Sequence, residues 1–458
     1  MRASLFRVGR QHSLLLLLLL AFVHGLIYAV VIPPWQAPDE TGHFEYSWLL
    51  AHQGRLPTTA TLSPEFEGQL IASLYEWRFG DFTGRPLAAV MPTRLDDLPE
   101  NVFVHNSRTV VAGRFSLAYL WEAFFLLPVR GQDLAFQLLV ARFSSILLNL
   151  GIIAFAYQTF GLLAPGRAGV PLAMTLVVVL MPQHTFINSM AGDGPLAELG
   201  AGLVLYGWLR LFRQGARPGL IVLLALATVA AIASKATAAF LVPLDLGLAA
   251  WWYFHRGTGI WSRRRFAYLG IGLAAVAAGA WIFGRSGLGA YALDAVQSLI
   301  SSPKLLLADA RNMTLDQALL ASQDSFWGNF GWMALPLSAR WYGAILALTV
   351  LALAGWLSGG REDGEPPRWA ALMMAAACLV AFGVFTWTSL LANVSGYYQF
   401  QGRYLFPVVV PFTFLLVGGW LRLAPARRRQ ILFGVVVFVA FLDAWSLLGY
   451  IIPYFYYR

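Results

Sequence analysis

The chain has 458 residues, of which 58% are hydrophobic and only 12% are charged. Soluble domains carry about 25% charged residues, so this composition excludes an ordinary soluble protein and predicts a polytopic membrane protein in a lipid bilayer. The formal net charge of +9 calls for no nucleic-acid partner, because basic residues gather in the short cytoplasmic loops of membrane proteins.

The first apolar run covers residues 13–32 and follows three arginines. It is long enough to cross a bilayer, and it ends in Pro-Pro-Trp where a cleaved signal peptide would have small residues. We therefore expect residues 1–32 to form a retained first transmembrane helix with its N-terminus in the cytoplasm.

About eleven apolar runs have the length of a membrane span. They lie at 13–32, 134–162, 169–185, 196–212, 219–235, 237–254, 267–284, 341–357, 370–391, 404–421 and 431–450. The expected fold is an all-α bundle forming a single membrane domain, 1–458. It divides into the first helix (1–32), a long loop (33–133), helices two to seven (134–284), a second long loop (285–340) and helices eight to eleven (341–458).

Arginines fall in alternate short loops and give the bundle an orientation. With the N-terminus in the cytoplasm, the loops at 163–168, 210–218, 255–266, 358–369 and 422–430 are cytoplasmic and hold most of the arginines, as the positive-inside rule requires. Both long loops then lie outside, as does the C-terminus. Amphipathic pieces at 65–71, 115–129, 290–307 and 325–335 predict helices along the membrane surface within these loops.

A carboxylate pair follows the first span. Asp39 and Glu40 come directly after Pro38, and His43 lies on the same face as Asp39 if a helix begins there. Such a carboxylate acts as a general base or binds a divalent metal ion. Spacing alone favours a plainer interpretation, in which Asp39 caps the helix.

Two further outward positions carry charge. Asp193 follows His184 and Asn188 between the third and fourth spans, where a solvated loop is the simplest interpretation. Lys235 lies at an outer helix end, and its ammonium group suits either the membrane interface or a phosphate.

Two aromatic motifs lie in the second half of the chain. Trp327, Asn329 and Trp332 occur within six residues, and they suit a sugar ring, an isoprenoid tail or the aromatic belt of a membrane interface. Gln401, Arg403 and Tyr404 lie at the outer end of a span, where arginine is suited to bidentate contact with phosphate.

Four ionisable groups lie within predicted spans. Arg142 and Glu198 are near outer helix ends, within reach of water or of each other. Asp245 and Asp443 are deeper. Because lipid does not tolerate unpaired charge, we expect these two carboxyl groups to be hydrogen-bonded or protonated, without a catalytic role.

Three motifs together resemble a bacterial membrane family, domain-of-unknown-function family 2142. They are Pro-Pro-Trp-Gln-Ala-Pro-Asp-Glu-Thr-Gly-His-Phe (33–44), Ser-Phe-Trp-Gly-Asn-Phe-Gly-Trp (325–332) and Gln-Gly-Arg-Tyr-Leu-Phe-Pro (401–407). That family is similar in layout to GT-C glycosyltransferases such as the protein O-mannosyltransferases and aminoarabinose transferases. The resemblance implies a polyprenyl-phosphate sugar as donor and Asp39 and Glu40 as catalytic base or metal ligands. More loosely, it implies Asp193, Lys235 and Arg403 as donor-phosphate ligands.

The leading hypothesis is a glycosyltransferase at the outer face of a bacterial plasma membrane. Asp39, aided by Glu40, would activate an acceptor hydroxyl on a glycan, lipid or protein. His43, Asp193, Lys235, Trp327, Asn329, Trp332, Gln401, Arg403 and Tyr404 are the expected substrate-binding residues, and a divalent metal ion is the only cofactor considered. A transporter or flippase of lipid-linked sugars and a non-catalytic assembly factor for envelope polysaccharide are the alternatives.

Overall fold

The computed structural model describes residues 2–58, 63–99, 115–167, 169–255, 315–358, 366–394 and 400–457. Among these residues seven helices are long and apolar enough to cross a membrane, and a bent pair would make an eighth. The prediction of an all-α membrane protein is therefore confirmed. The seven candidates are Gln11–Val31, Leu134–Leu163, Ala236–Phe254, Ala339–Leu357, Arg368–Ser389, Gly402–Leu423 and Pro425–Tyr456.

The elements follow one another along the chain with short connections. The α-helices are α1 (Arg2–Val31), α2 (Glu40–Gln53), α3 (Pro64–Glu76), α4 (Phe79–Thr83), α6 (Leu117–Leu126), α7 (Leu134–Leu163), α8 (Gly169–Val179), α9 (Pro182–Asn188), α10 (Gly194–Gln214), α11 (Pro218–Ser234), α12 (Leu241–His255), α15 (Leu315–Trp327), α16 (Ala339–Leu357), α17 (Arg368–Val394), α18 (Val409–Leu423), α19 (Arg428–Trp445) and α20 (Ile452–Tyr456). The short 3₁₀ helices are η2 (Leu95–Asp97), η4 (Leu127–Val129), η5 (Ala236–Phe240), η7 (Gly402–Val408) and η8 (Pro425–Arg427), and Ser446–Ile451 forms a π-helical turn.

Two of the expected spans form helices outside the group of seven. Residues 196–212 lie in α10, which carries Glu198, Arg210 and Arg213, and residues 219–235 lie in α11, which has only 17 residues. The expected span 267–284 lies outside the described residues, as does the amphipathic piece 290–307.

Glycines set the closest helix crossings of the bundle. A Cβ placed on Gly355 of α16 would lie 1.9 Å from the carbonyl oxygen of Gly419 on α18. Because that neighbour is backbone and cannot move aside, only glycine permits this approach. Small residues at helix interfaces are how membrane helices pack closely without a hydrophobic driving force between them.

The span α8–α9 is broken by a bend of 64°. At the break, the carbonyl of Val179 accepts hydrogen bonds from the Thr185 hydroxyl and from His24 Nδ1 of α1. His24 Nε2 lies 2.8 Å from a carboxylate oxygen of Asp443, which also accepts a hydrogen bond from Tyr28. The buried network thus supplies partners for a carbonyl freed by the break.

Asp245 also has partners within the bundle. It accepts hydrogen bonds from the indole of Trp208 and the hydroxyl of Thr228, each at 2.6 Å. The expectation that Asp245 and Asp443 are hydrogen-bonded is confirmed. Arg142 and Glu198, in contrast, do not pair with each other, since Glu198 contacts His184 and Asn188.

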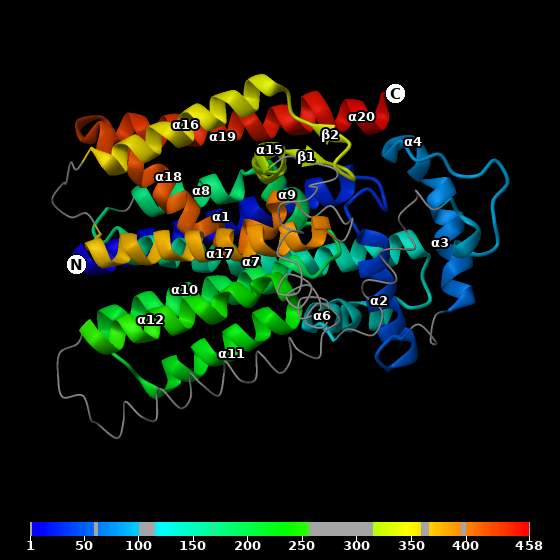
Figure 1. The fold of residues 1–458 in the computed structure, drawn as a ribbon, viewed down its shortest axis with the longest axis horizontal. Coiled ribbons are helices and arrows are strands. Elements are labelled where there is room, and N and C mark those ends of the chain that lie inside the picture. The colour runs from blue at the N-terminus through cyan, green and yellow to red at the C-terminus, as the bar shows by residue number, and fades with distance from the viewer. Residues whose placement is uncertain are drawn as a thin grey trace.

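A separate module covers one end of the bundle. Figure 1 shows α2, α3, α4 and α6 at the end opposite the N-terminus, with the C-terminus on the same side. The module has its own buried core, which includes Trp35, Phe44, Phe66, Phe79 and Tyr119. The helices expected within 65–71 and 115–129 are present as α3 and α6.

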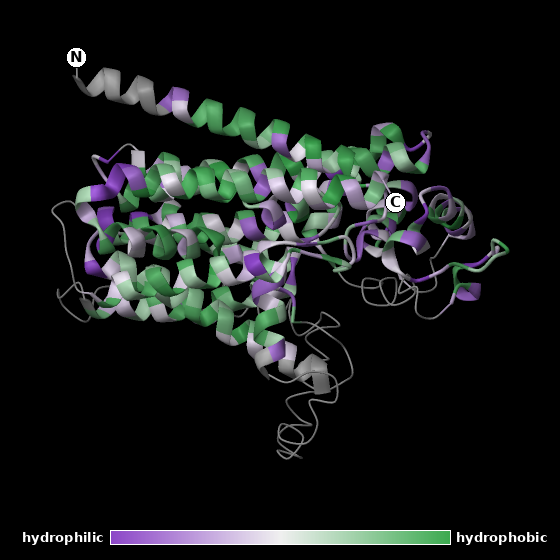
Figure 2. Cartoon of the chain, turned by 90° about the horizontal axis from the view of Figure 1, so that it is seen from above, coloured by the Kyte–Doolittle hydropathy of each residue, from purple (hydrophilic) through white to green (hydrophobic). Residues whose placement is uncertain are grey.

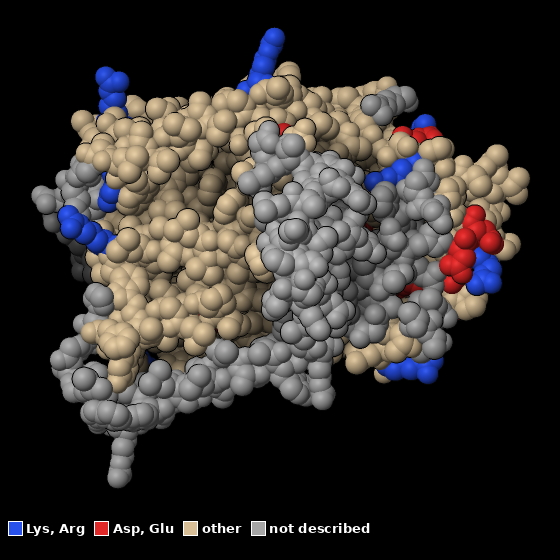
Figure 3. All heavy atoms as spheres, viewed as in Figure 1, with Lys and Arg blue, Asp and Glu red and all other residues tan. Residues whose placement is uncertain are grey.

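Polar residues follow the same division. In Figure 2 the bundle helices are mainly green along their length, and purple segments gather toward the ends. In Figure 3 most of the acidic side chains visible on that face lie at the end formed by the outer module. Figure 1 places the turns joining α7 to α8, α16 to α17 and α18 to α19 at the other end, near the start of α1.

One expected helix is wrong. Residues 325–335 form the last turn of α15 followed by a tight antiparallel hairpin, with β1 (Asn329–Phe330) paired to β2 (Leu335–Pro336). Gly331 and Met333 have φ angles of 63° and 60°. These left-handed conformations end the helix and turn the chain back.

Candidate functional site

The segment between α1 and α2 is tightly folded and carries two left-handed residues. Trp35 and Asp39 have φ angles of 70° and 63°. The Trp35 indole donates to Ser73 Oγ at 2.9 Å, and its carbonyl accepts from the Trp332 indole at 2.8 Å. A left-handed conformation costs a non-glycine residue about 1–3 kcal/mol. The surrounding contacts therefore hold this segment in a shape it would not otherwise adopt.

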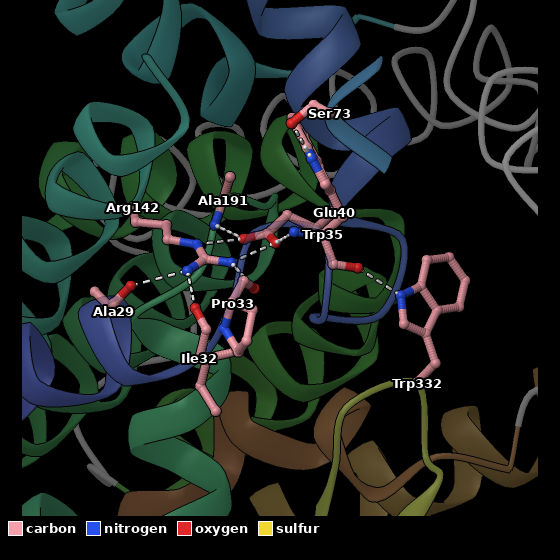
Figure 4. A network of polar contacts seen from close by, with 9 residues as sticks. All are labelled: Ala29, Ile32, Pro33, Trp35, Glu40, Ser73, Arg142, Ala191 and Trp332. Atoms are coloured by element: carbon pink, nitrogen blue, oxygen red, sulfur yellow. Dashed lines mark hydrogen bonds and ion pairs between the residues drawn. The ribbon is translucent and has the colours of Figure 1, made fainter. Parts of the chain in front are cut away.

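Glu40 is held by a single arginine of α7. The Arg142 guanidinium donates to both carboxylate oxygens of Glu40, at 2.8 and 2.7 Å, and to the carbonyls of Ala29, Ile32 and Pro33 (Figure 4). Glu40 also accepts from the backbone N–H groups of Trp35 and Ala191. The Glu40 side chain is fully buried, with 0% exposed, and Arg142 is 3% exposed.

This geometry corrects the expectation for Glu40. All of its contacts are to protein donors that fix the end of α1 and the start of α2, and it does not line the pocket described below. Glu40 is therefore a structural carboxylate, and it has no free oxygen for a substrate or a metal ion.

Asp39 points elsewhere. It occupies the N-cap position of α2, but its side chain makes no capping hydrogen bond. Its carboxylate instead accepts from the Arg403 guanidinium at 2.6 Å and is 42% exposed. The capping interpretation is therefore wrong for its side chain.

A pocket of about 540 Å³, counting its open mouth, lies beside this pair. Four segments meet around it: the start of α2, the connection from α9 to α10, η5 and η7. Its polar lining includes His43, Asn188, Asp193, Glu198, Lys235, Thr237, Arg403 and Tyr404. Asp39 follows the lining residue Pro38 and contacts Arg403, so its carboxylate belongs to the same group.

Two ion pairs and one aromatic ring organise the charges. Lys235 Nζ lies 2.5 Å from Asp193 Oδ1, and Arg403 binds Asp39. Both cations also lie over the Tyr404 ring, at 5.4 Å for the ammonium and 5.2 Å for the guanidinium. Cation–π contact and ion pairing together hold the cations at fixed positions.

The pairing keeps both carboxylates ionised. Burial would raise the pKa of Asp39, but Arg403, His43 and Lys235 outweigh burial and lower the pKa. The pKa of Asp193 is lowered in the same way, with burial opposed by Lys235, His43 and Arg403. At neutral pH the pocket therefore presents two carboxylates and two cations.

Six of the eleven predicted site residues meet here: Asp39, His43, Asp193, Lys235, Arg403 and Tyr404. Asp193 is not in a solvated loop, because the preceding α9 is almost entirely buried. The remaining predicted residues lie outside the pocket.

The aromatic motif supports the fold beside the pocket. Trp332 bonds to Trp35, and the Asn329 backbone exchanges hydrogen bonds with the Gln183 side chain. Trp327 is 4% exposed and lines a small apolar cavity between α8, α16, α18 and α19. These positions do not support direct contact with a sugar in the pocket.

Gln401 does not line the pocket either, and its amide oxygen is buried without a hydrogen-bond partner among the described residues. The next residue, Gly402, instead anchors the motif, donating from its backbone N–H to Ser325 Oγ at 2.7 Å. The Gly-Arg-Tyr turn is thus fixed against α15.

Sequence reasoning missed two buried acidic groups near the pocket. Glu122 of α6 accepts from Ser47 and from the backbone N–H of Gly192, both at 2.7 Å. Burial raises its pKa to about 8. Glu198 binds His184 and Asn188 at 2.7 and 3.0 Å. Nothing in the motif pattern marks Glu122, which lies in an apolar helix.

The described residues contain no group of three His, Cys, Asp or Glu side chains placed to hold a metal ion. Asp39 and Glu40 face different arginines, so the pair does not form the metal site considered from the sequence.

A scan against protein-family models finds no match, and a search of curated proteins finds none either.

Proposed function

We propose that the protein is an integral-membrane glycosyltransferase whose pocket takes a polyprenyl-phosphate sugar as donor. The observation that carries this proposal is the convergence of Asp39, Arg403 and Lys235, which are far apart in sequence, at one pocket. The motif resemblance to GT-C enzymes points the same way and supplies the donor class.

The proposed topology has eleven spans, with the N-terminus in the cytoplasm of a bacterium and the pocket at the outer face of the plasma membrane. The support is the arginine distribution. Arg167, Arg368 and Arg427 lie in or beside turns at the end of the bundle near the start of α1 (Figure 1). The pocket lies toward the opposite end, which is the outer face by the positive-inside rule.

The cations suit a phosphate. Arg403 has a buried Nε–H without a hydrogen-bond partner among the described residues, and Lys235 is 17% exposed. A guanidinium and an ammonium held around one ring would bind the donor phosphate and stabilise the negative charge that develops as it leaves.

Asp39 suits the general base. Its carboxylate is 42% exposed, and Arg403 and His43 keep its pKa low, so it is ionised at neutral pH. In the proposed reaction the acceptor hydroxyl oxygen bonds to the anomeric carbon, and its proton passes to Asp39. The bond from that carbon to the phosphate oxygen breaks, and polyprenyl phosphate leaves with the electron pair. Configuration at the anomeric carbon inverts.

One observation favours a second candidate, a transporter of lipid-linked sugars. The span α8–α9 is broken, and residues 188–193, which follow it, line the pocket. Broken helices that end at a binding site are common in transporters.

The test uses purified protein in liposomes with radiolabelled polyprenyl-phosphate mannose, glucose or galactose and a membrane extract as acceptor. Wild type should move label from lipid to a water-soluble or extract-bound product, and Asp39→Asn should reduce the rate about a hundredfold or more. The matched control is Asp81→Asn, because Asp81 also pairs with an arginine but lies on the exposed surface of α4. Unchanged transfer by Asp39→Asn would refute the proposal. Flipping of the donor across the bilayer without a new glycosidic bond would favour the transporter.

A further inference from the structure

His43 has one fixed hydrogen-bond partner, on a different helix. Its Nδ1 lies 2.6 Å from the hydroxyl of Tyr119, which belongs to α6. Tyr119 is 2% exposed, and the described part of the chain offers its hydroxyl no second partner. The two rings are tilted, with centroids 5.7 Å apart.

This contact determines which nitrogen carries the proton. Burial, with Asp193 and Glu122 nearby, raises the pKa of Tyr119 well above its usual value, so the hydroxyl keeps its proton at neutral pH. A buried hydroxyl proton without an acceptor costs about 1–3 kcal/mol. Tyr119 therefore donates to Nδ1, and a neutral imidazole must then carry its proton on Nε2.

The surroundings favour the neutral ring. Burial lowers the pKa of His43, Asp193 and Asp39 oppose this effect, and Lys235 and Arg403 add to it. These four charged groups and Tyr119 are the ionisable groups that act on the ring from the other sides of the pocket.

The Nε2 edge faces the pocket. His43 is a lining residue, and Nε2 has no hydrogen-bond partner among the described residues. Gly192 leaves space beside it, since even an added Cβ would lie 3.6 Å from Cδ2 and 4.0 Å from Nε2.

We propose that Tyr119 is a positioning residue that holds His43 as the neutral Nε2–H tautomer, so that His43 offers the pocket a hydrogen-bond donor and not a proton acceptor. The donor is matched to an acceptor oxygen of the ligand, whether a phosphate oxygen or a sugar hydroxyl. The identity of that ligand rests on the proposed function, but the tautomer does not. Proton acceptance by the imidazole is blocked at Nδ1, which leaves that task to Asp39.

Nitrogen-15 NMR of histidine-labelled protein tests the tautomer without any substrate. The chain has seven histidines, and the His43 signals are assigned as those lost in His43→Gln. We expect an unprotonated Nδ1 and a protonated Nε2 that do not change between about pH 6 and about pH 8, the range in which a free histidine titrates. A protonated Nδ1 in the wild-type protein would overturn the inference, and this result requires no variant at Tyr119.

Tyr119→Phe provides the second measurement. It keeps the ring and removes the hydroxyl, so the His43 signals should shift toward a mixture of tautomers and begin to titrate. Tyr75→Phe is the control, because Tyr75 of α3 donates to the Ala88 carbonyl at 2.8 Å, away from His43. His43 signals identical in Tyr119→Phe and wild type would also overturn the inference.

Binding of farnesyl phosphate and of inorganic phosphate then separates this inference from the proposed function. Tyr119→Phe should weaken binding of whichever phosphate the wild type binds by about tenfold, the loss of roughly one hydrogen bond. Wild-type protein that shows the expected tautomer but binds neither phosphate would contradict the proposed function and leave the tautomer assignment standing. Full affinity in Tyr119→Phe would instead contradict the role given to His43 as donor.

Discussion

Two adjacent carboxylates perform different tasks in this protein. Glu40 is fully buried against Arg142, whereas Asp39 is 42% exposed and pairs with Arg403 at the pocket. Neighbouring residues at the start of a helix point about 100° apart, so one side chain anchors the turn and the other is left for chemistry.

Arg142 should therefore be essential for stability. Arg142→Met leaves Glu40 as an unpaired buried carboxylate and should lower the free energy of unfolding by about 3–5 kcal/mol. Tryptophan fluorescence during unfolding in detergent measures the change. Arg142→Met with Glu40→Gln should recover part of the loss, because no unpaired charge remains.

The control for that pair is Arg94→Met. Arg94 pairs with Asp96 at 3.1 Å, but both side chains are more than 60% exposed, so the loss should be about 0–1 kcal/mol. An equal loss from the Arg94 and Arg142 variants would contradict the structural role assigned to Glu40.

Glu122 should make stability depend on pH. Its pKa is raised from 4.5 to about 8, chiefly by burial. Because the folded pKa lies above the unfolded one, the folded chain holds an extra proton between these values, and stability falls as pH rises through that window. Glu122→Gln, which is always neutral, should become more stable relative to wild type from about pH 5 to about pH 8. A difference in melting temperature that does not change with pH would show that Glu122 is already ionised.

Motif position predicted charged residues at the ends of helices better than it predicted their partners. Asp39, Lys235 and Arg403 were expected to act together and do meet at one pocket. The sequence could not indicate that Arg142 would take Glu40, since over a hundred residues separate them. Glu122 and Tyr119 lie in an apolar stretch where only folding reveals that α6 supports α2.

At the scale of elements, the turn at η7 determines where Arg403 lies. Gly402 sits against α15 so closely that an added Cβ would lie 2.2 Å from the Ser322 carbonyl and 2.4 Å from the Phe326 amide nitrogen. Both neighbours are backbone, so any side chain at position 402 must push η7 away from α15.

Gly402→Ala should therefore displace Arg403 and reduce both phosphate binding and glycosyl transfer, by about tenfold or more. Gly343→Ala is the matched control, because nothing lies within 4 Å of a Cβ on Gly343 in α16. Binding assays on both variants measure the effect. Wild-type affinity in Gly402→Ala would show that the turn does not position the guanidinium.

Hydrophobic periodicity predicted the elements where they are long, and local backbone chemistry overrode it where they are short. The apolar runs at 13–32 and 134–162 correspond to α1 and α7. The hairpin at 329–336 was missed, because its left-handed Met333 carries no glycine signal. The break between α8 and α9 was also missed, although Pro182 marks the start of α9.

At the scale of the whole molecule, the two ends of the chain lie at opposite ends of the bundle. Figure 1 places the N-terminus away from the outer module and the C-terminus beside it. An odd number of spans is consistent with this arrangement, as is the gathering of arginine-bearing turns at the N-terminal end.

Reporter fusions test the orientation. Alkaline phosphatase joined after residue 457 should be active, since it requires export, and a fluorescent protein joined at the same point should remain dark. A fusion in the connection between α18 and α19, near Arg427, should give the opposite result. A fluorescent C-terminal fusion would contradict both the eleven-span topology and an outward-facing pocket.

The most direct test of the central claim is an electron cryo-microscopy structure with a non-hydrolysable polyprenyl-phosphonate sugar bound. The proposed function predicts the phosphonate within hydrogen-bond distance of Arg403 and Lys235, with the anomeric carbon facing the side of the pocket where Asp39 lies. A head group bound outside this pocket, or an anomeric carbon shielded from Asp39, would contradict the assignment of Asp39 as the base.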